Sequence, residues 1–316
     1  MSSVLVELSQ QLKDKLTLLD IGASGGVYEP FRKVLSFSHL VEVDMDSRDF
    51  HTNENTPQTT RVYKAIVDDD IIENVKVFLT KSPHCSSTLL PDKSKLGNFP
   101  YTDLFEIQKE IEVPATSLNR LAQQHKLTFN WIKLDTQGTE LRIIQHMNKD
   151  LFENVICCDV EISLYAHYHG SDTFSEFHKF MTENGFLISD IVGIQSRIRL
   201  RKRDVDSLEK MGISASSFKK WPTSPEIRYI KNVSFDQSIE DLNQFLKIWI
   251  VSFATGNYPY CYYLSQKLKE SNLGGVRMSE TLERISMEAL KPEVPSSLGL
   301  LKQKVKRKLI SLLDKI

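Results

Sequence analysis

Two segments of the sequence place acidic residues and glycine at spacings that suit a ligand site. Residues 18–26 read LLDIGASGG, an apolar run that ends in Asp20 and passes into a glycine-rich turn. Residues 129–141 read FNWIKLDTQGTEL, a second apolar run that ends in Asp135 and continues through a glycine to Glu140. Open α/β sheets bind ligands at the carboxyl ends of their strands. The two segments therefore predict a nucleotide-like cofactor beside a polar reaction centre.

The glycine turn lets a ligand approach the backbone closely. Gly22, Gly25 and Gly26 lack side chains and tolerate positive φ, and we expect a helix near Val27 to direct its N-terminus at an anion. A dinucleotide site has GxGxxG after its strand, whereas this chain has DxGxSxG. Asp20 would repel a pyrophosphate but can hold an ammonium group. S-adenosylmethionine, whose amino acid head carries an ammonium, fits this site better than NAD.

Acidic residues after the next two apolar runs could contact the rest of such a cofactor. The second run ends VEVDMD at 41–46, roughly twenty residues after the turn, where an acid can accept both ribose hydroxyls. Asp44 is the first candidate and Glu42 the second. Asp68 follows the third run and is expected to line the adenine, with a solvated turn as the alternative.

Several motifs, in their order and spacing, resemble those of the FkbM family of S-adenosylmethionine-dependent methyltransferases. The matching segments are LLDIGASGG at 18–26, CSSTLLP at 85–91, VPATSLNRL at 113–121, WIKLDTQGTEL at 131–141, VEISLY at 160–165 and NGFLISDI at 184–191. The KLDxQGxE block is specific to this family. The resemblance covers roughly residues 15–235.

The resemblance implies an α/β fold of the Rossmann-like class I methyltransferase type, with a seven-stranded, mostly parallel sheet whose last strand is antiparallel. It also implies O-methylation, often of a sugar hydroxyl in a glycan, and hence a role in polysaccharide biosynthesis. We accordingly expect a methyltransferase domain over residues 1–235 and a helical extension over 236–316.

The family's site residues carry over to matching positions of this chain. They imply cofactor contacts by Asp20, Gly22 and Gly26 at the methionine part and by Asp44 at the ribose. We expect Ala23, Asp68 and Ser87 to complete the cofactor-binding set. The implied active-site residues are Lys133, Asp135, Gly138, Glu140 and Glu161. The family often has Glu-Pro where this chain has Asp44-Met45, so the ribose ligand stays open.

Methyl transfer to a hydroxyl needs a group that removes its proton. Asp135 and Glu161 end neighbouring strands, and two carboxylates at adjacent strand ends can bind a divalent cation such as Mg²⁺, which would lower the pKa of the hydroxyl. Without a metal, one carboxylate or a histidine such as His167 or His169 is the expected base. Asp159 lies on the same strand face as Glu161 and is held in reserve.

Two residues of the family block have structural alternatives. Glu140 could simply stabilise a helix N-terminus, which is worth about 0.3–1 kcal/mol. Lys133 could form an ion pair with a neighbouring acid. Either role would leave the residue outside the chemistry.

Apolar runs that alternate with helical patterns predict the elements that position these residues. The expected strands are 16–21, 38–43, 61–67, 129–135, 154–162, 186–192 and 226–232, and the expected helices are 27–36, 116–125, 139–147 and 173–184. This alternation predicts a largely parallel sheet with right-handed crossovers.

Two basic segments lie outside this pattern. Residues 197–203 read RIRLRKR within an excursion over 193–225, which is either a solvated edge or a site for an anionic acceptor such as a phosphate-bearing sugar. Residues 297–316 predict a basic amphipathic helix. That helix could make weak peripheral contact with an anionic membrane or pack on the domain or a partner.

The composition narrows the function classes. The 316 residues have a net charge of −1 and 41% hydrophobic content, which is typical of a globular protein and gives no basic field for nucleic acid. The four cysteines form no CxxC pair, so we expect free thiols in a cytoplasmic protein. The N-terminal residues predict no signal peptide, and no apolar run is long enough to span a membrane.

Three functional hypotheses remain. The first is an O-methyltransferase acting on a glycan or small hydroxylated acceptor. The second is a catalytically inactive module that binds S-adenosylmethionine and serves an interaction role. The third, a nucleotide-dependent oxidoreductase, is disfavoured by Asp20 and by the missing GxGxxG pattern. The sequence indicates neither the acceptor nor the oligomeric state.

Overall fold

The computed structural model describes residues 2–23, 25–45, 58–234, 241–271 and 273–291. The chain divides into two compact units, Met1–Asn257 and Tyr258–Ile316. The division falls after the helix α8 (Leu242–Ala254), so α8 groups with the sheet-bearing unit. It therefore lies later in the chain than the domain boundary that we predict at residue 235.

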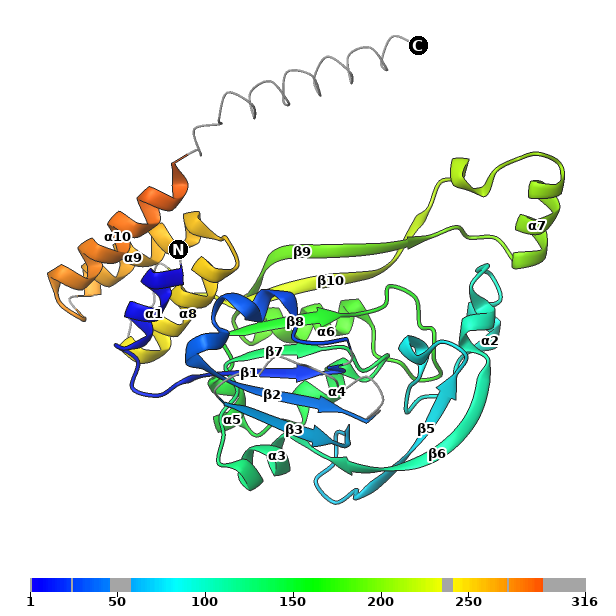
Figure 1. Ribbon diagram of the computed structural model, residues 1–316, viewed down its shortest axis with the longest axis horizontal. Helices are drawn as coiled ribbons and strands as arrows, with labels where there is room; N and C mark the ends of the chain where they lie inside the picture. Colours follow the sequence, from blue (N-terminus) through cyan, green and yellow to red (C-terminus); the bar gives the residue numbers. More distant parts are fainter. Residues whose placement is uncertain (1, 24, 46–57, 235–240, 272, 292–316) are drawn as a thin grey trace, which may run out of the picture. The chain divides into compact units, whose positions relative to one another are not determined.

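A seven-stranded sheet forms the centre of the first unit (Figure 1). Its order is β3-β2-β1-β7-β8-β10-β9. The strands are β1 (Leu16–Ile21), β2 (Ser38–Asp44), β3 (Thr59–Tyr63), β7 (Trp131–Leu134), β8 (Cys157–Glu161), β9 (Phe186–Arg197) and β10 (Trp221–Lys231). The pairs among β3, β2, β1, β7 and β8 are parallel, and β10 is antiparallel to both neighbours. This topology confirms the predicted Rossmann-like methyltransferase fold.

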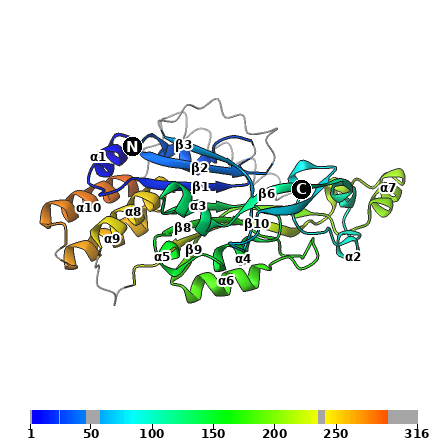
Figure 2. The same cartoon turned by 90° about the horizontal axis from the view of Figure 1, so that it is seen from below.

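Burial explains why the central strands read as continuous apolar runs. Every residue of β1 and β2 is buried, as expected for parallel strands covered on both faces. One face packs on α3 (Leu118–His125), α4 (Glu140–Gln145) and α6 (Phe174–Glu183), which together with the sheet form a large apolar core. Figure 2 shows α4 and α6 on that face beside α5 (Lys149–Glu153).

The predicted helices are confirmed except the first. α6 begins within the predicted range, with a capping box between Thr173 and Glu176. The helix predicted over 27–36 is wrong, because the chain forms two 3₁₀ segments, Glu29–Lys33 and Leu35–Phe37. Phe31 and Val34 are both buried, and their three-residue spacing is one that α- and 3₁₀-helices share, so the apolar pattern did not distinguish the two. No α-helix N-terminus therefore follows the glycine turn.

A second sheet with the order β4-β6-β5 comes from β4 (Ala65–Ile66), β5 (Asn74–Thr80) and β6 (Ile107–Thr116). The link between β5 and β6 carries a short helix, α2 (Lys93–Leu96). The carboxyl ends of β1, β2, β7 and β8 point toward this side of the unit (Figure 1). The predicted strand 61–67 is divided between the two sheets, as β3 and β4.

The predicted excursion over 193–225 is largely a continuation of the last two strands. β9 and β10 extend past the other strands as a two-stranded ribbon that ends at α7 (Lys202–Lys210; Figure 1). β9 forms the edge of the sheet and pairs with β10 along its whole length, from Phe186 to Arg197.

Three described helices follow the last strand of the sheet. α8 belongs to the first unit, and the other two belong to the second. α8 contacts α1 (Ser2–Ser9), and its residues from Phe245 to Ala254 are buried. The second unit contains α9 (Tyr258–Ser271) packed against α10 (Val276–Leu290). The predicted basic helix over 297–316 lies outside the described residues. Within the described part of the chain, no helix has the length and apolarity needed to cross a membrane.

Candidate active site

A cavity of about 660 Å³ opens at the carboxyl ends of the parallel strands, a volume typical of small-molecule sites. The strand ends contribute Gly22, Asp44, Asp135 and Glu161. The β5–β6 link contributes Ser82 to Ser86 together with Tyr101, Leu104 and Phe105. Further polar lining residues are Gln137, His167 and, from β9 and β10, Gln195, Arg197, Thr223 and Ser224. Of the predicted site residues, the structure thus brings Gly22, Asp44, Asp135, Glu161 and His167 together around one cavity.

Gly22 lies at the closest approach between the glycine turn and the end of β7. Its φ is +77°, and a Cβ there would lie 2.4 Å from the carbonyl oxygen of Asp135. Its N–H donates to the Val43 carbonyl at 3.0 Å, which ties the turn to the end of β2. No side chain fits at this position, because the Asp135 backbone occupies the place that a Cβ would need. Ala23 and Gly26 follow in the same turn but do not line the cavity.

Lys133 binds the backbone of the glycine turn through its ammonium group. Its Nζ donates to the Gly22 carbonyl at 2.7 Å and lies 3.3 Å from Asp20 Oδ1 and 3.8 Å from Asp135 Oδ2. Burial raises the pKa of Asp20 to about 6, and the Lys133 ammonium opposes that rise. Asp20 and Lys133 do not line the main cavity. Lys133 forms ion pairs with neighbouring acids, which is the structural role that the sequence left open for it.

The predicted ribose and adenine residues differ in their placement. Asp44 ends β2, is buried and lines the cavity beside Met45. Asp68 follows β4, is exposed and does not line it. Its placement matches the solvated turn that was the alternative to adenine contact.

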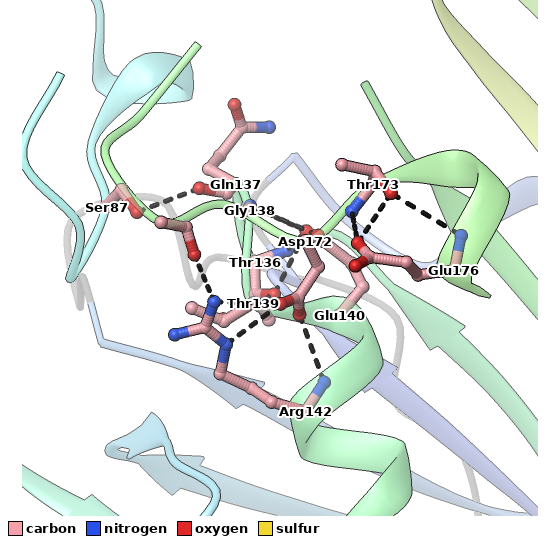
Figure 3. A network of polar contacts seen from close by, with 11 residues as sticks. Ser87, Thr136, Gln137, Gly138, Thr139, Glu140, Arg142, Asp172, Thr173 and Glu176 are labelled. Carbon is pink, nitrogen blue, oxygen red and sulfur yellow. Dashed lines mark hydrogen bonds and ion pairs between the residues drawn. The ribbon is translucent and has the colours of Figure 1, made fainter. Parts of the chain in front are cut away.

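The turn after β7 is built around Glu140 (Figure 3). The buried Glu140 carboxylate accepts hydrogen bonds from the N–H and hydroxyl of Thr136, both at 3.0 Å, and from the N–H of Gly138 at 3.0 Å. Burial raises the pKa of Glu140 to about 7, although the hydrogen bond from the Gly138 N–H opposes the rise. The carboxylate therefore stabilises its own turn and does not face the cavity.

Gln137 connects this turn to Asp135. Its side-chain amide donates to Asp135 Oδ1 at 2.7 Å, and its Oε1 accepts from the Tyr168 hydroxyl at 3.2 Å. Its backbone carbonyl accepts from the buried Ser87 hydroxyl at 2.9 Å (Figure 3). Ser87 thus acts on the turn, whereas Ser86 lines the cavity. Gln137 is not among the site residues predicted from the sequence, although it is the glutamine of the family block.

Glu161 faces Asp135 across the carboxyl ends of β8 and β7. Burial, Asp135 and Glu226 raise its pKa to about 8. Gln195 donates to Glu161 Oε1 at 2.9 Å. Glu226 and Gln195 were not predicted as site residues. Only the antiparallel register of β10, with Glu226 opposite Glu161, brings the β9–β10 pair to the site.

A smaller cavity of about 170 Å³ lies behind these carboxylates and is lined by Tyr28, Lys133, Asp135, Asp159, Glu161 and Glu226. Asp159, the reserve candidate, is closed off by Arg228, whose guanidinium donates to both of its oxygens at 2.7 and 2.9 Å. Among the residues that the structure describes, no group of three His, Cys, Asp or Glu side chains could hold a metal ion. Asp135 and Glu161 are therefore joined by no third ligand of this kind among the described residues, and the structure does not support the predicted Mg²⁺ site.

His167 lines the cavity from the loop after β8. Its Nδ1 lies 3.1 Å from the Ser163 hydroxyl and its Nε2 lies 3.3 Å from the Tyr101 hydroxyl. Burial lowers its pKa to about 4, so the imidazole is neutral at neutral pH. His169 is exposed, lies 3.8 Å from Asp92 and does not line the cavity.

Three comparisons relate the chain to known proteins. Residues 20–188 match the family model described as the methyltransferase FkbM domain. No curated protein matches the chain. The chain is similar to magnesium protoporphyrin IX methyltransferase from Synechocystis PCC 6803 with bound SAM, at 10% identity and a TM-score of 0.31, over 73% of this chain and 77% of that one. It is also similar to TrmK of M. capricolum in complex with S-adenosyl-homocysteine, at 8% identity and a TM-score of 0.30, over 92% and 96%.

Proposed function

The chain belongs to the FkbM methyltransferase family, and from this membership we propose that it is an O-methyltransferase that uses S-adenosylmethionine to methylate a sugar hydroxyl. The observation that carries the proposal is the meeting of Gly22, Asp44, Asp135 and Glu161 around one cavity. The first two suit a nucleoside cofactor and the last two suit the activation of a hydroxyl.

The residues around the glycine turn fit the cofactor. Gly22 lines the cavity, and its lack of a side chain keeps the turn close to Asp135, where the amino acid part of the cofactor would lie. The Asp44 carboxylate at the end of β2 can accept the ribose hydroxyls. Lys133 donates to the Gly22 carbonyl and pairs with Asp20, and these contacts fix the backbone of the turn. When bound, S-adenosylmethionine supplies an electrophilic methyl group.

Glu161 is the base in this proposal. A hydroxyl is a poor acid, so a positioned base near its operating pH assists the reaction. The pKa of Glu161, about 8, makes its ionised form a stronger base than an ordinary carboxylate. Asp135, oriented by Gln137, accepts a hydrogen bond from the acceptor and fixes its position. Buried walls such as Phe105 and His167 limit the access of water.

Calorimetric titration with S-adenosylhomocysteine tests cofactor binding, with NADH as the control ligand. We expect micromolar binding of S-adenosylhomocysteine, weakened about tenfold or more in Asp44→Asn by loss of the ribose hydrogen bonds, and no binding of NADH. Tighter binding of NADH would contradict the proposal.

Turnover separates the enzyme from the inactive binding module. Glu161→Gln should keep S-adenosylhomocysteine affinity and lose methyl transfer to a sugar acceptor, which would be followed with radiolabelled cofactor. Cofactor binding without methyl transfer to any member of a broad panel of hydroxylated acceptors would favour the binding module.

A further inference from the structure

The β9–β10 ribbon contributes one basic residue, Arg197, to a cavity that is otherwise lined by carboxylates and neutral side chains. Gln195 and Arg197 line the cavity from β9, and Trp221 lies directly opposite Arg197 in the β9–β10 register. The Arg197 guanidinium lies over the Tyr101 ring at 5.7 Å from its centroid. The Arg199 guanidinium lies 4.9 Å from the Trp221 centroid. Stacking of this kind holds a guanidinium plane in a preferred orientation.

Arg197 is free to bind an anion. Among the described residues that line the cavity, it is the only lysine or arginine. Its guanidinium donates to the Ser196 carbonyl and to Gln195 Oε1, both at 3.2 Å, and forms no ion pair with a described carboxylate. Arg201, by contrast, pairs with Asp204 at 2.6 Å. An arginine has five N–H donors, so Arg197 keeps donors for a ligand.

The position of Arg197 separates it from the cofactor residues. Gly22 and Asp44 belong to the ends of β1 and β2, whereas Arg197 belongs to β9. The strands β7, β8 and β10 lie between β1 and β9 in the sheet, and they carry Asp135 and Glu161. The carboxylates of the proposed reaction centre therefore lie between the cofactor side and the arginine side.

A hydrogen-bonded chain joins Arg197 to the reaction centre. Gln195 accepts from Arg197 at 3.2 Å through Oε1 and donates to Glu161 at 2.9 Å through Nε2. A ligand that engages Arg197 thus lies one side chain away from the proposed base. This is the arrangement expected where one part of an acceptor is anchored and another part reacts.

We propose that Arg197 binds an anionic group of the acceptor, a carboxylate or a phosphate carried by the sugar whose hydroxyl is methylated. The inference rests on the proposed function and adds the substrate class to it. Arginine suits both anions because its planar fork forms two parallel hydrogen bonds with either. Arg199, stacked on Trp221, adds a second positive charge outside the cavity lining.

Ligand-observed NMR on protein saturated with S-adenosylhomocysteine tests the proposal. The probes are glucose, galactose and mannose, each beside its uronate and its 6-phosphate. We expect at least one uronate or 6-phosphate to bind about tenfold or more tightly than its neutral parent, as charge-assisted hydrogen bonds predict. Preference for the uronate assigns a carboxylate, and preference for the 6-phosphate assigns a phosphate.

Two variants complete the experiment. Arg197→Gln should abolish the preference for the anionic sugar and leave S-adenosylhomocysteine affinity unchanged. Arg201→Gln, on the same ribbon but already paired with Asp204, should retain both. Equal binding of neutral and anionic sugars, binding of no probe, or weaker S-adenosylhomocysteine binding in Arg197→Gln would overturn the inference. Failure of the wild type to bind S-adenosylhomocysteine would instead contradict the proposed function.

Discussion

The side-chain amide of Gln137 donates a 2.7 Å hydrogen bond to the carboxylate of Asp135, two residues earlier in the same turn. Gln137 adopts a φ of +60°, a conformation that is costly for residues other than glycine. The Tyr168 hydroxyl and the Ser87 hydroxyl bind its other polar groups. The turn thus accepts backbone strain at a residue whose side chain orients a cavity carboxylate.

This relationship predicts that two substitutions of Gln137 lower activity to a similar degree but differ in stability. Gln137→Gly should lower kcat about tenfold, because Asp135 loses its orienting donor, while S-adenosylhomocysteine affinity stays unchanged. Gln137→Ala should lower kcat similarly but be less stable than Gln137→Gly by about 1 kcal/mol, because only glycine tolerates the positive φ without strain. Steady-state kinetics and urea unfolding of both variants check this, and equal stability of the two would refute the strain argument.

The pKa of Glu161 predicts how the reaction depends on pH. If Glu161 is the base, kcat/KM should rise with pH and level off above its pKa of about 8, because only the ionised carboxylate accepts a proton. Glu161→Gln should remove that limb together with most of the activity. A flat profile between pH 6 and 9 in the wild type, measured over that range by radiolabelled methyl transfer, would exclude Glu161 as the base.

The same group predicts a pH-dependent difference in stability. The pKa of Glu161 is raised in the folded chain, so the unfolded chain releases its proton first and folding weakens as pH rises from about 4.5 to about 8. Glu161→Gln lacks this ionisation. Its free energy of unfolding relative to wild type should therefore increase between pH 5 and pH 8.5 and stay constant beyond that. Denaturant titrations at several pH values measure this difference, which should not shrink with rising pH.

The strands, helices and strand-end acids that depend on local sequence patterns could be predicted. The buried strands β1 and β2 read as apolar runs, and the helical pattern over 173–184 predicted α6. It also placed Asp44, Asp135 and Glu161 at strand ends, which the parallel sheet then gathers at one edge. Glu226 and Gln195 could not be found this way, because their place at the site depends on the antiparallel register of β10 and β9.

The roles within the KLDxQGxE block were also hard to assign from sequence. Lys133 and Asp135 are two residues apart, a spacing that places both on the same strand face. The lysine nevertheless binds the carbonyl of Gly22, whereas the aspartate lines the cavity. Glu140 turns back onto the amides of its own turn. Which acid faces a ligand is decided by a turn geometry that includes positive φ at Gln137 and Gly138, and the residue types alone do not specify it.

The contact between Gly22 and Asp135 predicts a loss of cofactor binding that a neighbouring glycine can calibrate. A Cβ at Gly22 would lie 2.4 Å from the Asp135 carbonyl oxygen, whereas a Cβ at Gly25 would meet nothing within 4 Å. Both glycines have positive φ, at +77° and +89°, so alanine at either should cost about 1–2 kcal/mol in backbone strain. Gly22→Ala alone must also push the turn away from β7.

We therefore expect S-adenosylhomocysteine affinity to fall at least about tenfold in Gly22→Ala and to change little in Gly25→Ala, since displacement of the turn reshapes the cavity edge. Calorimetric titration measures the affinities, and circular dichroism confirms that both variants are folded. Because the two substitutions share the strain at positive φ, their difference isolates the clash with Asp135. Similar affinities in the two variants would show that the close approach of Gly22 to Asp135 does not shape the cofactor site.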